Sequence, residues 1–386
     1  MQLGIVANEF FERSIGRMGG FGWAARQVAT FFNAQPHLGV HVVFLAAHRK
    51  QYGARSHLRV HGTVLLGRAP APGYRRRLRQ QQLDLVLTID YRPQYRAILE
   101  ILAQTPVVVW VRDPRPPAVR VVLNSLKIPG EPAVRPQGIR VVDCTSLSSL
   151  LAPHHPPSRP ILFATPAPSL SRFLESTYHI SGVACTFLPN IVDINAGAVV
   201  KTQQPQVIFL GRLDPIKRPW VFVELARHFP GVEFLMLGQS HFQGRGSWVP
   251  QQLPENVQLL GHVDGEQKLH LLSSAWVVVN TSIHEALPTS FLEALACETP
   301  LLSCTNREGL VARFGIFTGA WDGDGLEGLP RFVSGLRQLL ENRSWRTELG
   351  QQGRAWVERT HNGTNFLRAF DALCACAGLE RLASLT

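Results

Sequence analysis

The sequence predicts an α/β protein of two domains, each built on a parallel β-sheet with helices on both faces. With 386 residues, the chain is long enough for two domains that each have a hydrophobic core. Continuous apolar runs alternate with helix-like segments in both halves, which is typical of parallel strands buried on both faces. Residues 186–206 lose this periodicity and turn polar, so the domain boundary is placed there.

The first half contains apolar runs that we expect to form strands. They are residues 3–7, 40–46, 64–67, 83–89, 106–111, 139–144 and 160–165. The first run has neither a basic segment before it nor a small-residue cleavage site after it, so we expect a strand and not a signal peptide. Helix-like or irregular segments separate most of the runs. Because ligands bind at the carboxyl ends of parallel strands, functional residues are expected just beyond these runs.

The second half repeats the same rhythm of strands and helices. We expect strands at residues 207–211, 232–238, 257–261, 276–282 and 300–304. Helical patterns lie between them at residues 219–229, 265–274 and 289–297. This order predicts a second parallel sheet, and the natural ligand site is a cleft between two such domains.

Charge and composition exclude several classes of protein. The net charge of +11 belongs to the first half: residues 1–200 hold 22 Lys and Arg against 10 Asp and Glu, and residues 201–386 hold 17 against 18. Such a basic surface suits anionic lipid, acidic acceptors or nucleic acid, and a solvated surface without a partner is the alternative. No nucleic-acid-binding motif is present, so nucleic acid is not expected.

No apolar run is long enough to span a membrane, and the six cysteines have no CxxC pair. A cytoplasmic protein is expected.

A cluster of glycines precedes the first helical segment. The residue types of Gly20-x-Gly22-x-x-Ala25 match a dinucleotide-binding fingerprint. However, about a dozen residues separate Gly20 from the first strand, which ends at Ala7. That fingerprint requires a tight turn directly after the strand and an acidic residue after the second strand. A nicotinamide or flavin enzyme is therefore not expected. The glycines predict a loop whose backbone approaches a ligand closely, and flexible glycines without a ligand are the alternative.

Cations follow the first strand of the second half. The segment GRLDPIKRP places Gly211, Arg212 and Lys217 just beyond the carboxyl end of the expected strand 207–211. Arginine offers a planar fork to phosphate oxygens, and lysine offers a compact charge. The segment therefore predicts a site for a diphosphate.

Two carboxylates lie about seventy residues further along the chain. Glu285 is placed in a loop, and Glu293 in the first turn of the helix expected at 289–297. The start of a helix attracts phosphate, and two carboxylates beside it suit a ligand with hydroxyls at both ends of a diphosphate. There are plain alternatives: Ser290 and Glu293 fit a capping box, and Glu285 fits a solvated surface acid.

Arg112 and Asp113 follow the expected strand 106–111, where ligands of parallel sheets bind. We interpret them as active-site residues. A surface salt bridge between these two neighbours is the alternative.

The segments GRLDPIKRP and HEALPTSFLEALACETPLLS together resemble the donor-binding half of family 4 retaining glycosyltransferases. FLPNIVD at 187–193 is similar to the interdomain segment of that family, and the pair Gly19 and Gly20 resembles its donor-phosphate loop. The similarity covers about residues 186–320. The resemblance implies the GT-B architecture, in which two Rossmann-like domains face each other across a cleft. The expected domains are 1–190 and 191–363, with residues 364–386 crossing back onto the first.

The resemblance also implies a role for each site residue. Arg212 and Lys217 would hold the diphosphate, Glu285 would contact the donor sugar, and Glu293 would bind the ribose. The expected donor-binding set also contains Gly19, Gly20, Gly211, His262, Val263, Ala286, Leu287, Pro288, Thr289 and Ser290. The loop 262–264 would line the base pocket. Ala286 stands where many relatives have glycine. Arg112 and Asp113 stand where many relatives have histidine, so the resemblance implies that they lie on the sugar side or the acceptor side of the site.

The implied activity is transfer of a sugar, with retained configuration, from a UDP- or GDP-linked donor to a glycan, lipid-linked or other acceptor. The leaving phosphate would take the acceptor's proton, so no strong side-chain base is required. Protein cations would replace a metal, so neither a metal nor a further cofactor is expected. The alternative is an inactive GT-B module that binds a nucleotide sugar or a protein partner. Peripheral contact with the inner face of an anionic membrane is expected to involve the basic half.

Overall fold

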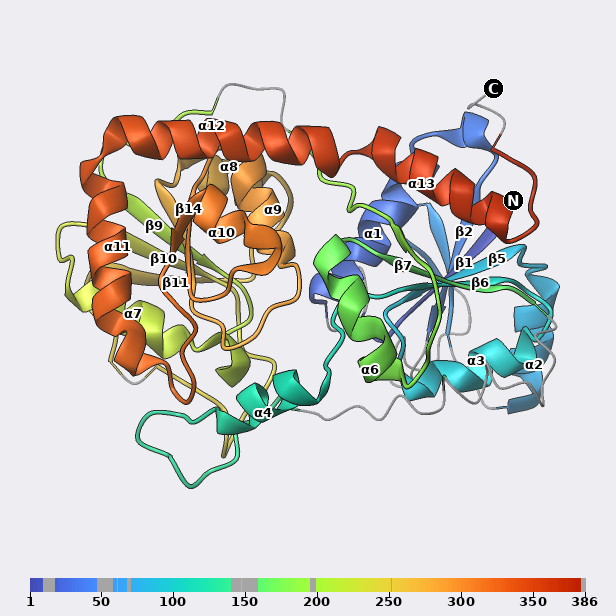
Figure 1. The fold of residues 1–386 in the computed structure, drawn as a ribbon, viewed down its shortest axis with the longest axis horizontal. Helices are drawn as coiled ribbons and strands as arrows, with labels where there is room; N and C mark the ends of the chain where they lie inside the picture. The colour runs from blue at the N-terminus through green and yellow to red at the C-terminus, as the bar shows by residue number, and fades with distance from the viewer. Residues whose placement is uncertain are drawn as a thin grey trace. The chain divides into compact units, whose positions relative to one another are not determined.

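The structure is a computed structural model that describes residues 1–9, 18–46, 58–60, 62–67, 71–139, 147, 159–194, 199–250 and 252–382 (Figure 1). The chain divides into two compact units. Unit 1 is Met1–Pro116, Val142–Ile191 and His361–Thr386, and unit 2 is Pro117–Val141 and Val192–Thr360. This division differs from the expected domains 1–190 and 191–363 chiefly because residues 117–141 group with unit 2.

Unit 1 is built on a sheet with the strand order β3-β4-β2-β1-β5-β6-β7-β8. All neighbouring strands are parallel except β3 and β4, which are antiparallel. The strands are β1 Gln2–Ala7, β2 His41–Ala46, β3 Leu58–Val60, β4 Thr63–Leu66, β5 Leu85–Ile89, β6 Val107–Trp110, β7 Ile161–Thr165 and β8 Cys185–Phe187. Six of them coincide with expected runs, and the short β3 and β8 were not expected. Most of the expected strand 139–144 lies outside the described residues.

Helices of unit 1 pack on this sheet through apolar faces. The helical elements are α1 Gly20–Asn33, η1 Pro36–Leu38, α2 Ala71–Gln80, η2 Pro93–Tyr95, α3 Arg96–Ile101, η3 Pro168–Phe173, α6 Leu174–Tyr178 and α13 Gly363–Cys376. The C-terminal α13 joins α1 through aromatic contacts: the ring of Phe32 lies 5.3 Å from that of Phe370 and 6.1 Å from that of Phe366. These buried rings attach the end of the chain to the core of unit 1.

Unit 2 is built on a fully parallel sheet with the order β11-β10-β9-β12-β13-β14. The strands are β9 Gln206–Leu210, β10 Glu233–Leu237, β11 Val257–Gly261, β12 Val277–Asn280, β13 Leu301–Ser303 and β14 Gly315–Phe317. The helical elements are α4 Pro117–Ser125, η4 Pro215–Lys217, α7 Pro219–Arg227, α8 Gly265–Ser274, α9 Thr289–Ala296, η5 Arg307–Gly309, α10 Leu310–Arg313, η6 Leu326–Gly328, α11 Leu329–Glu341 and α12 Arg343–Thr360. The expected strands and helices of this half are confirmed, and β14 was not expected.

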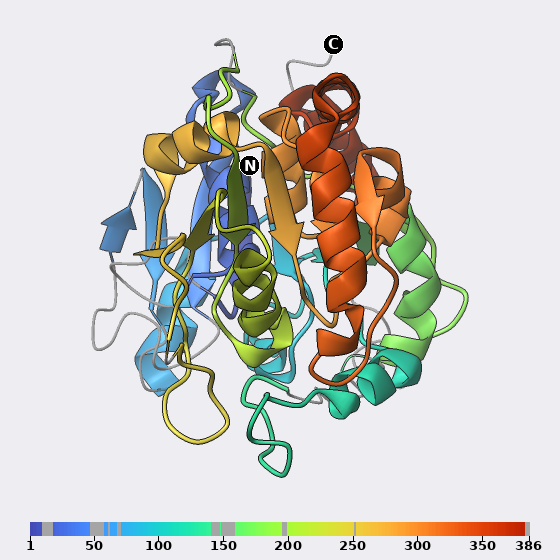
Figure 2. The same ribbon diagram turned by 90° about the vertical axis from the view of Figure 1, so that its left-hand side faces the viewer.

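Helices α7 and α11 cover one face of this sheet, and both are in view in Figure 2. Phe222 of α7 and Leu336 of α11 are fully buried in the same apolar cluster as the strand residues Val207 and Phe234. The order of strands reverses between β9 and β12 in unit 2 and between β1 and β5 in unit 1. Such switch points are where open parallel sheets bind ligands, at the carboxyl ends of the strands.

Candidate functional site

The loop after β9 carries the expected cations of unit 2. Arg212 keeps about a third of its side chain exposed, at 35%, and its Nε lies 3.3 Å from Oδ2 of the buried Asp214. The other carboxylate oxygen of Asp214 accepts a hydrogen bond of 2.9 Å from the His241 N–H. Asp214 thus fixes the loop and leaves the guanidinium of Arg212 at the surface of unit 2.

Lys217 and Glu285 meet at the switch point of unit 2. The Nζ of Lys217 forms an ion pair and hydrogen bond with Oε1 of Glu285. The same oxygen accepts hydrogen bonds from Asn280 Nδ2 at 3.0 Å and from Ser282 Oγ at 2.6 Å. Lys217 ends the 3-10 turn after β9, and Glu285 follows β12, so the two neighbouring strands bring their charges together. The structure therefore brings together two residues that lie 68 positions apart in the sequence.

Glu285 is buried and ionised. Burial raises the pKa of its carboxyl group, but the Lys217 charge and the hydrogen bonds from Lys217, Ser282 and Asn280 outweigh burial and hold the pKa below its ordinary value. The alternative of a solvated surface acid is therefore wrong, because only 8% of the residue is exposed. An ionised carboxylate accepts hydrogen bonds and does not donate them.

Arg218 is a structural residue of this site that the sequence did not single out. It is 1% exposed, and its guanidinium donates to the Thr281 carbonyl at 2.8 Å, the Trp321 carbonyl at 2.7 Å and Cys304 Sγ at 3.2 Å. In return, Thr281 Oγ1 donates to the carbonyls of Lys217 and Arg218 at 2.8 and 2.9 Å. These contacts join the loop after β9 to the loop after β12. The only sequence signal for this residue is its position directly after Lys217. The sequence does not show which of the two cations, Lys217 or Arg218, is buried.

Helix α9 begins at Thr289 without a side-chain cap. Pro288 occupies the N-cap position, and no side-chain hydrogen bond caps it. The alternative of a capping box between Ser290 and Glu293 is therefore wrong, since both residues lie inside the helix. Glu293 is the fifth residue of the helix and not part of its first turn. The first N–H groups of an α-helix have no acceptor within the helix, so they attract an anion.

Glu293 faces α8 in unit 2. Its Oε1 lies 2.6 Å from Lys268 Nζ, and the same ammonium lies 3.3 Å from Asp264 Oδ1. Asp264 also caps α8 by accepting a hydrogen bond from the Gly265 N–H. Of the expected base-pocket residues, Val263 is buried beside this cap at 5% exposure, and His262 follows β11. The structure thus links Glu293 to the loop 262–264 through Lys268.

Glycine is required where two loops of unit 2 approach each other. A Cβ on Gly238, just after β10, would collide with the carbonyl oxygen of Gly211, just after β9. The Gly211 N–H donates to Leu237 O at 3.0 Å. The backbone after β9 is therefore held against its neighbour, which fixes where the following cations stand.

In unit 1, the amides at the start of α1 already hold an anion. Glu9, which follows β1, accepts hydrogen bonds through Oε2 from Phe21 N–H at 2.8 Å and from Gly22 N–H at 3.1 Å. A Cβ on Gly19 would lie 2.6 Å from the Oε1 of Glu9, whereas one on Gly20 would meet nothing within 4 Å. The expected phosphate loop is thus an anion-binding backbone whose anion in this structure is a carboxylate of the same chain.

Arg112 and Asp113 have different surroundings in unit 1. Arg112 is 5% exposed and lies over the ring of Trp110, with its guanidinium carbon 4.5 Å from the ring centroid. Asp113 forms an ion pair of 2.7 Å with Arg115. A surface salt bridge between Arg112 and Asp113 therefore does not explain the pair.

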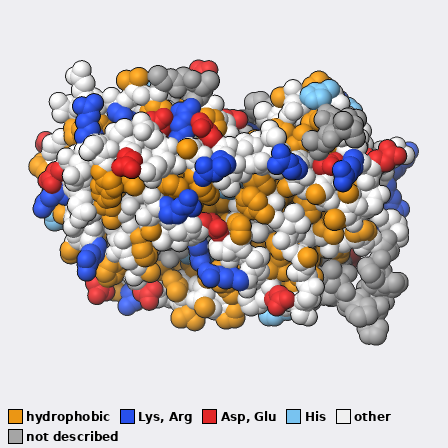
Figure 3. Space-filling model, turned by 45° about the horizontal axis from the view of Figure 1, so that its top comes forward, with side chains coloured by type: hydrophobic (Ala, Val, Ile, Leu, Met, Phe, Trp, Pro, Cys, Tyr) orange, Lys and Arg blue, Asp and Glu red, His pale blue; other side chains and the backbone are white. Residues whose placement is uncertain are grey.

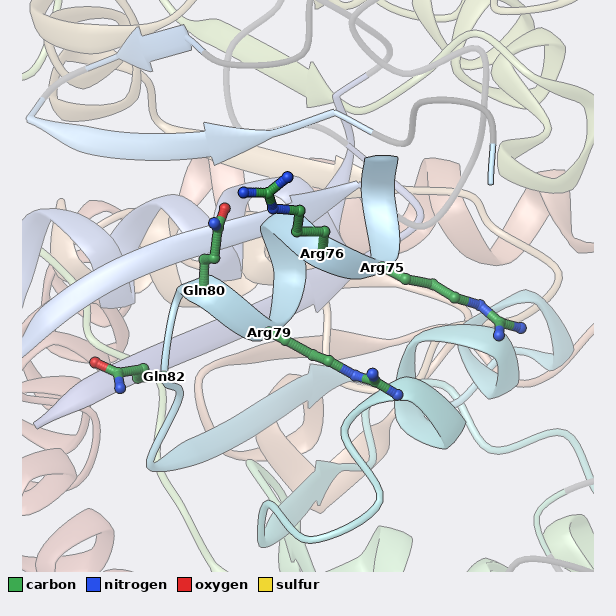
Figure 4. A pocket seen from close by; sticks show the side chains of 5 residues that line it. All are labelled: Arg75, Arg76, Arg79, Gln80 and Gln82. Atoms are coloured by element: carbon green, nitrogen blue, oxygen red, sulfur yellow. The ribbon is translucent and has the colours of Figure 1, made fainter. Parts of the chain in front are cut away.

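Helix α2 of unit 1 carries four arginines, Arg75, Arg76, Arg77 and Arg79. Tyr74 and Leu78 bury one face of this helix, and Arg75, Arg76 and Arg79 are exposed. Together with Gln80 and Gln82 these arginines line an open hollow, in which Arg75 and Arg79 extend side by side (Figure 4). By contrast, Lys and Arg side chains are dispersed among Asp and Glu on the face drawn in Figure 3. The arginines of α2 therefore form a local basic surface.

Within the described part of the chain, no group of three or more His, Cys, Asp or Glu side chains is placed to hold a metal ion. None of the described helices is both long and apolar enough to cross a membrane.

The fold and these loops define a class of protein: a two-unit α/β protein that presents cations and a helix start at the switch point of a Rossmann-like sheet. Residues 193–356 match the model of the family described as glycosyl transferases group 1. Sucrose-phosphate synthase from Thermosynechococcus elongatus has a similar structure, with a TM-score of 0.68 and 16% identity over 97% of this chain and 99% of that one. HepE from Anabaena, solved with UDP-glucose, has a TM-score of 0.62 and 15% identity over 97% and 100%.

A curated relative agrees with this match. The D-inositol 3-phosphate glycosyltransferase of Mycolicibacterium smegmatis is 31% identical over 111 residues, which cover 26% of this chain and 25% of the relative. The matched segment thus spans about a quarter of that relative's length. The chain has the GT-B fold, and within it residues 193–356 match the model of the glycosyl transferases group 1.

Proposed function

We propose that this protein transfers a sugar from a nucleoside diphosphate sugar, UDP- or GDP-linked, to a glycan, lipid-linked or other acceptor. The observation that carries the proposal is the Lys217–Glu285 pair at the switch point of unit 2, within the segment that matches the family. The HepE structure with UDP-glucose and the pneumococcal GtfA structure with UDP and GlcNAc support a UDP-sugar as donor.

Arg212 and Lys217 neutralise the leaving diphosphate in this proposal. An ammonium has three donors, so Lys217 contacts Glu285 with one and offers others to phosphate oxygens. The donors that reach the Glu285 side chain from described residues all contact Oε1. That leaves Oε2 to accept a hydrogen bond from a hydroxyl of the donor sugar.

The remaining donor-binding residues complete the proposed site. Glu293 accepts hydrogen bonds from the ribose, and His262 and Val263 line the base pocket. The backbone at Gly211 and at Ala286, Leu287, Pro288, Thr289 and Ser290 surrounds the phosphates. Gly19 and Gly20 supply amides to the donor phosphate, next to the amides of Phe21 and Gly22 that Glu9 binds.

The proposed transfer retains the configuration of the sugar and uses no metal. The leaving phosphate accepts the acceptor's proton, and the fixed cations and the start of α9 stabilise the charge on the leaving group. Catalysis then depends on charges positioned in advance and not on a side-chain base.

Chelators therefore should not reduce activity. We expect transfer rates in excess EDTA to equal those without it, because Arg212 and Lys217 do the work of a divalent cation. Rates would be compared after dialysis against EDTA and again after magnesium or manganese is added. Activity that EDTA removes and magnesium restores would contradict a metal-independent site.

The proposed function is tested by binding and turnover together. A thermal-shift screen against UDP, GDP and their sugars should show stabilisation by at least one nucleotide, because a ligand that binds only the folded state raises stability by mass action. Donor hydrolysis or transfer is then measured with the nucleotide sugar that stabilises most. Binding without turnover would favour the inactive GT-B module, and no binding of any nucleotide would overturn both.

Peripheral binding to anionic membranes is also proposed for the basic surface of α2. Each basic residue near an anionic bilayer contributes about 1 kcal/mol, so three contribute roughly 3 kcal/mol. Replacing Arg75, Arg76 and Arg79 by glutamine should weaken cosedimentation with phosphatidylserine vesicles roughly 100-fold, and added salt should weaken wild-type binding.

A matched control replaces three exposed arginines of unit 2, Arg331, Arg337 and Arg343, by glutamine. This variant loses the same charge but should retain vesicle binding. Equal losses in the two variants would show that net charge alone acts, and binding that is absent or independent of salt would refute the membrane proposal.

A further inference from the structure

The guanidinium of Arg112 is buried in unit 1, and one of its donor atoms, Nη1, has no acceptor among the described residues. Only 5% of the residue is exposed, and no described residue accepts a hydrogen bond from its buried Nη1. The residue lies just past β6, at the carboxyl edge of the sheet where parallel sheets bind ligands. A buried polar atom without an acceptor is uncommon in native proteins, so it calls for an explanation.

Asn190, also in unit 1, repeats this pattern. Its side chain is fully buried, and neither Oδ1 nor Nδ2 has a hydrogen-bond partner among the described residues. Its backbone N–H donates to His361 Nδ1 at 3.1 Å. Burial, together with the nearby charge of Arg112, lowers the pKa of His361 to about 3, so the ring is neutral and accepts this bond. His361 thus connects Asn190 to the surroundings of Arg112.

The two acids whose charges act on Arg112, Asp90 and Glu9, contact other groups. Asp90 pairs with Arg92 at 3.0 Å and accepts a hydrogen bond from the Tyr178 hydroxyl. Glu9 accepts from the amides of α1. Burial lowers the pKa of Arg112 to about 9, opposed by the charges of Asp90 and Glu9, so the group is still charged at neutral pH. A buried charge calls for a counterion or for hydrogen bonds at every donor.

We propose that Arg112, together with Asn190, is a binding site for an anionic group, a carboxylate or a phosphate ester, on a sugar that this protein uses as substrate. Guanidinium binds such groups through a planar fork, and the Asn190 amide supplies a neutral donor beside it. Stacking on Trp110 holds the plane of the fork in place. This inference rests on the proposed sugar transfer and narrows its substrates to acidic sugars.

The anion has two possible sources, and the probes separate them. UDP-glucose and UDP-glucuronic acid differ by a carboxylate on the donor sugar. Glucose, glucuronic acid and glucose 6-phosphate, each added with UDP, differ by an anion on a free sugar. Affinity is measured by calorimetric titration with wild-type protein, Arg112→Gln and, as a matched control, Arg96→Gln, which removes an exposed arginine of α3.

Wild type should bind the anionic member of one series roughly 10- to 100-fold more tightly than its neutral counterpart. Arg112→Gln should abolish this preference, and Arg96→Gln should keep it. A preference confined to the nucleotide sugars assigns the anion to the donor, and one confined to the free sugars assigns it to the acceptor.

Two outcomes overturn the inference. One is wild-type protein that binds UDP but does not distinguish anionic from neutral sugars, which leaves the proposed function intact. The other is an Arg112→Gln variant that loses stability yet keeps the preference, which would make Arg112 a packing residue only. If no nucleotide binds while free acidic sugars bind through Arg112, the inference stands and the proposed function falls.

A second variant keeps the test valid if Arg112→Gln does not fold. Arg112→Lys retains the charge and the stem but loses the planar fork, so it should keep only part of the preference for the anion. A preference in Arg112→Lys that equals the wild-type value would exclude recognition by the fork.

Discussion

Replacing Lys217 with methionine is expected to lower turnover with the nucleotide sugar by about 10²- to 10³-fold. Fixed charges that stabilise a developing anion contribute rate factors of roughly this size when one of them is removed. The effect should appear mainly in kcat, because the charge on the diphosphate grows as the bond to the sugar breaks. Steady-state kinetics with the donor identified by thermal shift measure it, and Arg212→Gln should act in the same direction.

Exposed Lys127 of unit 2 supplies the control, since Lys127→Met removes an equivalent charge away from the site. This control should keep wild-type kinetics. Lys217→Met also leaves the buried Glu285 without its cation, so the double variant Lys217→Met with Glu285→Gln separates catalysis from folding. If the double variant is stable and either variant turns over at nearly the wild-type rate, Lys217 has no role in the reaction.

The Lys217–Glu285 ion pair makes the free energy of unfolding depend on pH. The pKa of Glu285 lies below its ordinary value of 4.5 in the folded protein, so its pairing stabilises the fold fully above that value. This contribution is lost as the pH falls through the folded pKa. In Lys217→Met the largest lowering influence is gone and burial remains, so the variant should lose stability at a higher pH than wild type in acid titrations.

Replacing Arg218 with methionine is expected to destabilise unit 2 by about 3–5 kcal/mol, as for other buried charged networks that lose one member. Methionine fills much of the same volume but donates no hydrogen bonds. The carbonyls of Thr281 and Trp321 then lose their buried donor, at about 1–3 kcal/mol each. Differential scanning calorimetry is the suitable measurement, because a chain of two units need not unfold in one step.

Arg227→Met is the matched control on the neighbouring helix, where the side chain is 46% exposed. Exposed substitutions usually change stability by less than about 0.5 kcal/mol. A melting transition of Arg218→Met that matches this control would show that the buried guanidinium is not what holds the two loops together.

The sequence was sufficient for the architecture because parallel strands buried on both faces leave continuous apolar runs. The runs at 3–7 and 207–211 became β1 and β9, the central strands of the two sheets. The missed strands β3, β8 and β14 lie at the edges of the sheets, and β8 and β14 are only partly buried, so they leave no continuous apolar run. Residues 117–141 group with unit 2 through long-range packing that no local pattern records.

The sequence predicted which charged residues follow strands β9 and β12, but it did not predict the contacts that they make. Spacing placed Lys217 and Glu285 after strands, and the pairing of β9 with β12 brought them together. Spacing did not show that Arg218 would be the buried cation of this loop, because Arg212, Lys217 and Arg218 all follow the same strand. Nor did it show Glu9 at the start of α1, since that contact depends on how the chain leaves β1.

Glu9 also bears on how unit 1 meets a phosphate. Its carboxylate is tethered close to the amides of α1, so it competes with dissolved anions at an effective concentration set by the chain. A lone phosphate ion in dilute solution is at a disadvantage against this resident group. A larger ligand that is anchored elsewhere has the same advantage of proximity, so occupancy at α1 selects for molecules that bring a phosphate along with other points of attachment.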